Sequence, residues 1–140
     1  MPGRFFIDTN VLVYSFDVGE TRKRRLAQDM IGTSLASGDG IISYQVVQEF
    51  LNVATSKFAK PLRIEDSKAY LDTVLMPLCR VYPDAELYHA ALDLKARFGY
   101  GFYDSLILAA ALQAGCSVLY SEDLQDGQTV RDLTIRNPFA

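Results

Sequence analysis

Four acidic residues occupy positions where carboxylates could hold a divalent metal ion: Asp8, Glu49, Asp104 and Asp123. No Lys or Arg stands beside any of them in the sequence. Acids brought together raise one another's pKa and cost stability unless a cation offsets them. An all-oxygen ligand set without His or Cys favours Mg²⁺ or Mn²⁺ over zinc. Such an ion can activate water and orient a phosphodiester, so the chemistry predicted is metal-assisted hydrolysis.

Each acid also has a purely structural interpretation. Asp8 and Asp104 stand where helices begin, and Asp often caps free amides there and interacts well with the helix dipole. Asp123 opens a turn, which is a common place for Asp. Glu49 lies at the edge of an apolar arc on a helix, so its side chain either reaches solvent or points into a cleft. The case for a site therefore depends on all four acids meeting at one end of one sheet.

Short apolar strands that alternate with helices must bring these acids together. The predicted strands are Arg4–Ile7, Ile41–Ile42, residues 79–82 and Ser117–Tyr120, with Leu133–Ile135 as a possible edge strand. The predicted helices cover residues 11–16, 21–37, 44–55, 64–75, 83–98 and 103–114, and their expected end signals include Gly38, Pro77, Gly99 and Gly115. Ser43 is expected to cap the helix that starts at residue 44.

This alternation predicts the α/β class and a single domain over residues 1–140. Its expected architecture is an α/β/α sandwich around a central parallel sheet of four to five strands. Ligands of such sheets bind beyond the carboxyl ends of the strands. Asp8 follows the first strand and the pair Glu122-Asp123 follows the fourth, so we expect the site at this edge. Which member of that pair faces the metal stays open.

Composition adds few constraints on function. The 140 residues are 49% hydrophobic, and no apolar stretch approaches the roughly 20 residues of a membrane span. No secretory signal pattern opens the chain, so we expect a cytoplasmic protein. Cys79 and Cys116 are isolated, which indicates core thiols rather than a zinc site.

The net charge of −3 is unusual for a nucleic-acid-binding protein. Basic residues are nevertheless clustered at 22–25 and at Lys57, Lys60 and Arg63. They are either solvated helix faces or contacts for a phosphate backbone. Tyr100, Phe102 and Tyr103 flank Asp104, and core packing is the favoured interpretation over stacking on unpaired bases.

The succession of short motifs resembles that of the PIN domain family. These motifs are Phe6-Ile7-Asp8-Thr9-Asn10, then Glu49, then Tyr103-Asp104-Ser105, then Tyr120-Ser121-Glu122-Asp123. A compact chain of this length is similar to the VapC ribonuclease toxins of type II toxin–antitoxin pairs. That resemblance implies an α/β/α sandwich, a Mg²⁺ or Mn²⁺ site, cleavage of RNA, a homodimer and inhibition by a small VapB-type antitoxin.

The resemblance also assigns roles to individual residues. It implies that Asp8, Glu49, Asp104 and Asp123 are the catalytic acids and metal ligands, with Asn10 and Ser121 orienting the acids or water.

Other classes of protein fit the sequence less well. A phosphotransfer domain is disfavoured because Asp8-Thr9-Asn10 lacks a second aspartate and no lysine follows the fourth strand. A serine or cysteine hydrolase needs a base, but the one histidine, His89, lies within a helix and no nucleophile-elbow glycines are near it. Two alternatives stay open within the resemblance: a housekeeping RNA-processing nuclease, and a PIN-like binding or assembly module without catalysis.

Overall fold

The fold is a six-stranded sheet with helices on its two sides. A computed structural model describes residues 3–140 and gives the strand order β3-β2-β1-β4-β6-β5. Four neighbouring pairs are parallel, and only the β5–β6 pair is antiparallel. The strands are β1 (Arg4–Ile7), β2 (Gly40–Ser43), β3 (Cys79–Val81), β4 (Cys116–Tyr120), β5 (Thr129–Val130) and β6 (Leu133–Arg136).

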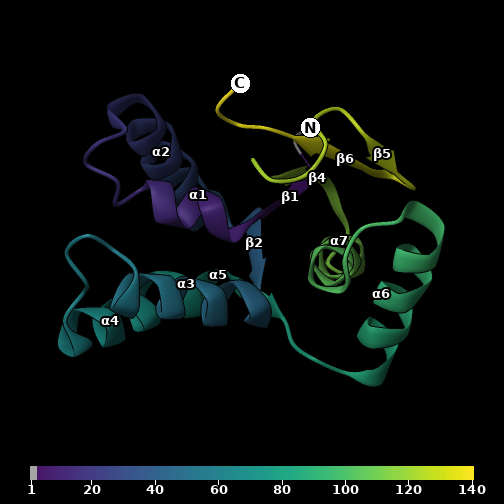
Figure 1. The fold of residues 1–140 in the computed structure, drawn as a ribbon, viewed down its shortest axis with the longest axis horizontal. Coiled ribbons are helices and arrows are strands. Elements are labelled where there is room, and N and C mark those ends of the chain that lie inside the picture. Colours follow the sequence, from purple (N-terminus) through teal and green to yellow (C-terminus); the bar gives the residue numbers. More distant parts are fainter. Residues whose placement is uncertain (1–2) are drawn as a thin grey trace.

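The helices divide between the two sides of the sheet. Figure 1 shows α6 and α7 on one side of β2 and the helices α1 to α5 on the other. The helical segments are α1 (Thr9–Tyr14), α2 (Thr21–Ser37), α3 (Tyr44–Ser56), α4 (Ile64–Tyr70), a π-helical turn (Leu71–Leu75), α5 (Met76–Leu78), α6 (Ala85–Phe98) and α7 (Phe102–Gln113). The expected α/β class and parallel sheet are thereby confirmed.

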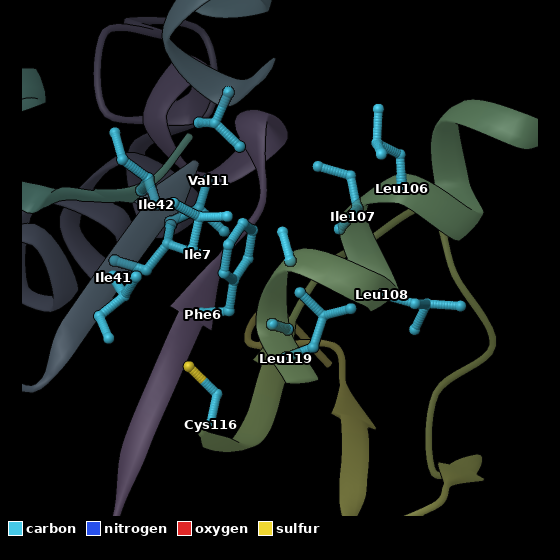
Figure 2. Close-up of a cluster of buried hydrophobic side chains, with 14 of the residues drawn as sticks. Phe6, Ile7, Val11, Ile41, Ile42, Leu106, Ile107, Leu108, Cys116 and Leu119 are labelled. Carbon is cyan, nitrogen blue, oxygen red and sulfur yellow. The ribbon is translucent and has the colours of Figure 1, made fainter. Parts of the chain in front are cut away.

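The central strands are buried because their side chains are apolar on both faces. Phe6, Ile7, Ile41 and Ile42 are fully buried, as a parallel sheet covered by helices requires. Figure 2 shows these side chains in one cluster with Leu119 of β4 and residues of α7. The α7 helix is apolar on every side and is buried from Ser105 to Ala111. Burial of this segment therefore holds the first turn of α7, which precedes it, in a defined position.

The order of the strands creates a switch point between β1 and β4. From β1 the chain adds β2 and β3 on one side, and then returns to place β4 and β6 on the other. Parallel sheets of this kind bind ligands at the carboxyl ends of the two strands where the order reverses. The backbone N–H of Asp8 donates to the carbonyl oxygen of Tyr120 at 3.0 Å, so the two strand ends are tied together.

The structure differs from the sequence-based expectation in three local features. The sheet has six strands rather than four to five, because Thr129–Val130 adds a short antiparallel strand beside β6. Pro77 does not end its helix: the chain continues as α5 to Leu78 after the π-helical turn. Pro77 is tolerated at the start of α5, where its missing N–H costs little. Ser43 precedes α3, but its hydroxyl makes no capping hydrogen bond.

The predicted glycine ends and the buried thiols are confirmed. Gly38 and Gly99 cap α2 and α6 in the left-handed conformation, with φ of 76° and 78°. Cys79 and Cys116 are both free and buried. No helix within residues 3–140 has the length and apolar character needed to cross a membrane.

We expect Asp84→Ala to reduce stability without touching the candidate site. Asp84 is the N-cap of α6, and its carboxylate accepts a hydrogen bond from the backbone N–H of Leu87 at 2.7 Å. Loss of such a cap costs about 1 kcal/mol. Urea denaturation should show this loss in the free energy of unfolding, and unchanged stability would mean that the capping bond contributes nothing.

Candidate functional site

Asp8 is a buried carboxylate at the end of β1. Its side chain is 7% exposed, accepts from the backbone N–H of Thr9 at 2.7 Å and accepts from the hydroxyl of Ser121 at 2.8 Å. Its pKa is raised from 3.8 to about 6, mainly by burial and also by the negative charges of Glu49 and Asp123, while the two hydrogen bonds oppose this shift. Asp8 thus caps α1, as its structural interpretation predicts, but at an electrostatic cost that capping alone does not require.

Asp123 meets Asp8 through a hydrogen-bonded pair of polar residues. The side-chain amide of Asn10 donates to the Asp123 carboxylate at 3.2 Å and to the Ser121 hydroxyl at 3.4 Å. The same hydroxyl accepts from the backbone N–H of Asp123 at 3.2 Å while donating to Asp8. Ser121 therefore uses its one donor and both lone pairs between the two acids. Asn10 and Ser121 lie where orienting residues would be needed.

Glu49 is held inside the site rather than released to solvent. One carboxylate oxygen accepts from the Thr9 hydroxyl at 2.7 Å and the other from the side-chain amide of Gln45 at 3.3 Å. Gln45 also donates to the carbonyl oxygen of Tyr103 at 3.2 Å. Periodicity alone left two orientations open for Glu49, and these hydrogen bonds decide between them. They also join α1, α3 and α7 at one place.

Asp104 lies in the first turn of α7, on the exposed side of an otherwise buried helix. No side chain caps this helix N-terminus, so Asp104 does not fill the capping role that could have explained it. Partial burial raises the pKa of Asp104, and the charges of Asp123 and Glu49 raise it further. Like charges on three elements are thus close enough to disfavour the ionised form.

The structure brings all four predicted acids to the same edge of the sheet. The negative charges of Glu49 and Asp123 help to raise the pKa of both Asp8 and Asp104, so the four side chains are near one another. As the side chains stand, no three acid, His or Cys groups in residues 3–140 are close enough together to hold an ion. Glu49 and Asp123 line an open groove of about 630 Å³, which also contains Asn10 and Lys57. The donor set consists of oxygen atoms alone, which suits Mg²⁺ or Mn²⁺.

Glu122 has a different environment from its neighbour Asp123. Its two carboxylate oxygens bond to the ammonium of Lys23 and the hydroxyl of Tyr14, each at 2.6 Å. These two hydrogen bonds lower the pKa of Glu122. Asp123 is the acid of this pair that contacts Asn10, so the geometry favours Asp123 as the fourth acid of the site.

The aromatic residues near Asp104 divide between packing and exposure. Tyr100 and Phe102 pack against the core, and the Tyr100 hydroxyl donates to Gln128. Tyr103 is 69% exposed next to the acids. Core packing is therefore confirmed for two of the three, and Tyr103 remains available to contact a ligand.

Sequence reasoning missed Thr9 and Gln45, which position Glu49. Gln45 precedes Glu49 by four residues on α3, a spacing that places two side chains on one helix face. That spacing is a signal the sequence contained. Thr9 offered no such signal, because it contacts Glu49 from another helix, 40 positions away.

We expect Thr9→Val to weaken any activity that depends on Glu49. Valine keeps the shape of threonine but removes the hydroxyl that fixes one carboxylate oxygen. Residues that orient metal-binding groups typically contribute about 10- to 100-fold to affinity or activity. The check is kcat and the Mn²⁺ concentration for half-maximal activity, with Thr9→Ser as the variant that restores the hydroxyl. Equal values for Thr9→Val and the unmodified protein would contradict this role.

Fold and site together define a class of protein: an α/β sandwich that gathers four carboxylates at the switch point of a mostly parallel sheet. The chain belongs to the PIN domain family, whose model matches residues 5–125. The matched residues contain all four acids. No functionally curated protein matches the sequence.

Solved structures with the same fold include several from toxin–antitoxin systems. The DNA-bound VapBC complex of Salmonella typhimurium has a chain with a TM-score of 0.67 and 18% identity, covering 97% of this chain and 98% of that one. VapBC2 of Rickettsia felis, bound to a DNA fragment from its promoter, has a chain with a TM-score of 0.63 and 20% identity. The match covers 95% of this chain and 97% of that one. VapC20 of Mycobacterium tuberculosis, a toxin that cleaves the sarcin–ricin loop, has a TM-score of 0.61 and 20% identity. The match covers 85% of this chain and 89% of that one.

Proposed function

We propose that this PIN domain is a divalent-metal-dependent ribonuclease that hydrolyses RNA phosphodiester bonds. The observation that supports it most is the gathering of Asp8, Glu49, Asp104 and Asp123 at one edge of the sheet, where the pKa of two of them is raised. A purely structural protein has no reason to bury one acid and place others beside it. PIN domains are typically nucleases, and that class of chemistry fits an all-oxygen donor set.

The four acids would together hold one or two Mg²⁺ or Mn²⁺ ions. When bound, such an ion supplies positive charge to the reacting phosphodiester and to the attacking water. Asn10 and Ser121 fix the carboxylates of Asp8 and Asp123, which reduces the cost of arranging the site during the reaction. The remaining ligands would be water and substrate oxygens, as Mg²⁺ prefers.

The groove beside the acids suits a single nucleic-acid strand. Lys57 lines this groove and also an adjoining apolar pocket of about 530 Å³ that contains Phe16 and Phe58. A cation between an acidic centre and aromatic side chains can contact a phosphate while unpaired bases lie against apolar surface. Lys57 is therefore the basic residue from the sequence clusters that we assign to RNA binding.

We propose a biological role as the toxin of a type II toxin–antitoxin pair. Structural relatives occur in VapBC complexes, which supports a small VapB-type antitoxin as partner. The homodimer is proposed from the family resemblance alone. A housekeeping RNA-processing role is the alternative. Induced expression in a bacterial host tests the choice: a toxin arrests growth and the Asp104→Asn variant does not, whereas growth unaffected by an active enzyme favours the housekeeping role.

The deciding experiment is cleavage of a mixed single-stranded RNA pool by the purified protein. The reactions contain Mg²⁺, Mn²⁺ or EDTA, and the protein is freed of any co-purified partner. We expect cleavage with metal and none with EDTA. Folded, partner-free protein that cleaves no RNA with any metal would support the binding-module interpretation instead.

A further inference from the structure

Glu122 is locked into a half-buried cluster at the junction of α1, α2 and the C-terminal tail. The ammonium of Lys23 and the hydroxyl of Tyr14 each contact one of its oxygens at 2.6 Å. The side chains of Lys23 and Glu122 are 23% and 25% exposed. An ion pair sheltered to this degree is screened less by water and salt than a surface pair. We call Lys23, Tyr14, Glu122 and Phe139 the latch.

The C-terminal tail contributes Phe139 to the latch, where its ring lies against Tyr14 and Lys23. The Phe139 ring packs edge-on against Tyr14 with centroids 4.9 Å apart, and the Lys23 ammonium lies 4.7 Å and 5.7 Å from the two ring centroids. Arg22 donates to the carbonyl oxygen of Phe139 at 2.6 Å and holds the tail against α2. Two members of the basic run at 22–25 are therefore occupied by contacts within the chain.

A path from the latch to the candidate metal site runs through the backbone of Glu122 and then through hydrogen bonds. The backbone N–H of Glu122 donates to the side-chain oxygen of Asn10 at 3.3 Å. The amide of Asn10 in turn donates to Asp123 and Ser121, and Ser121 donates to Asp8. Fixing the Glu122 side chain thus fixes the backbone that orients Asn10. Asn10 contacts Asp123 directly and Asp8 through Ser121, so its orientation helps to fix the positions of both carboxylates.

We propose that Lys23 is a positioning residue for the metal site, acting through Glu122 and Asn10 with Tyr14 and Phe139 as support. The inference rests on the proposed metal-dependent function of the four acids. The latch also keeps Glu122 paired, so that it does not join the four acids as a fifth negative charge. Lys23 itself would contact neither metal nor RNA.

Lys23→Met tests the latch against a direct role of Lys23 in binding RNA. Positioning predicts about a 10- to 100-fold loss of Mn²⁺ affinity, measured by calorimetry without RNA, and a matching fall in kcat. The KM for RNA and its salt dependence stay unchanged, and Lys23→Arg restores most of the affinity. A raised KM, a shallower salt dependence and unchanged Mn²⁺ affinity would instead identify Lys23 as a phosphate contact and overturn the proposal.

A double-mutant cycle asks whether Lys23 acts through Glu122. We expect Lys23→Met to lower Mn²⁺ affinity much less when Glu122→Gln is already present, because the partner charge is gone. Additive losses would overturn the proposed path. Glu122→Gln also serves if Lys23→Met folds poorly, since glutamine keeps an oxygen for Tyr14. Arg63→Met is the matched control, because it breaks the exposed Arg63–Asp66 ion pair and should leave Mn²⁺ affinity unchanged.

A readout without metal or RNA separates this proposal from the proposed function. In ¹⁵N NMR spectra of the metal-free protein, the side-chain amide signals of Asn10 should shift in Lys23→Met and return in Lys23→Arg. Unshifted Asn10 signals would overturn the latch even in an active nuclease. If the unmodified protein cleaves no RNA, the proposed function fails, and the Asn10 signals still decide whether Lys23 positions this residue.

Discussion

Asp104→Asn should reduce RNA cleavage by at least about 100-fold while leaving the fold intact. Residues that merely orient metal ligands contribute 10- to 100-fold, so loss of a ligand itself should cost more. The substitution keeps the size of the side chain and removes one negative charge. Asp104 does not cap α7, and its pKa is raised by burial and by Asp123 and Glu49. Removing the charge should therefore leave the Tm of the metal-free protein equal or higher.

The measurement is the initial rate of cleavage at saturating Mn²⁺, together with thermal unfolding of both proteins. Asp84→Ala is the matched control among acidic residues, because Asp84 caps α6 and lies outside the groove. It should lower stability and leave the rate unchanged. Full activity of Asp104→Asn would show that Asp104 is not a residue of the catalytic site. A lost rate with a greatly lowered Tm would mean that its role is structural.

Asp8 should make the metal-free protein less stable as the pH rises. Its pKa is raised from 3.8 to about 6 in the folded protein, so the folded state binds this proton more tightly than the unfolded chain. The resulting stabilisation is complete below pH 4 and is lost as the pH rises through 6. A difference of roughly two pKa units corresponds to about 3 kcal/mol, which is a large part of the stability of a small domain.

Asp8→Asn therefore should stabilise the metal-free protein above pH 6 by up to about 3 kcal/mol. Asparagine can still accept from the N–H of Thr9 through its side-chain oxygen, but its amide nitrogen cannot accept from Ser121, so the loss of that hydrogen bond makes about 3 kcal/mol an upper bound. Urea denaturation at pH 4, 5, 6 and 7 measures the effect, with Asp84→Asn as a control at an exposed N-cap. Mn²⁺ should stabilise the unmodified protein at pH 7 and not Asp8→Asn, because a ligand stabilises only the state that binds it. Equal pH dependence of the two proteins would contradict an uncompensated charge at Asp8.

The same four acids have opposite effects on the protein without and with a bound cation. The acids cost folding energy in the absence of a cation, and the same charges would hold a cation when one is present. Asn10, Ser121, Thr9 and Gln45 lower this cost only in part, because each supplies a neutral donor. A site that is destabilising on its own and held by a surrounding network is typical of function rather than packing.

The sequence alone predicted most of the elements and that the four acids lie at one edge of the sheet. Apolar runs such as Arg4–Ile7 can be buried on both faces only within a covered parallel sheet, and the apolar α7 can lie only in the core. Left-handed caps at Gly38 and Gly99 were readable because few other residues adopt that backbone conformation. These features are local, so the order of residues determines them.

Tertiary structure decided how those elements meet. The orientation of Glu49 depends on Thr9 across 40 positions, and the division of roles between Glu122 and Asp123 depends on Lys23, 99 positions away. Periodicity describes one element at a time, whereas these contacts join separate elements. They exist only once the strand order places β1 between β2 and β4.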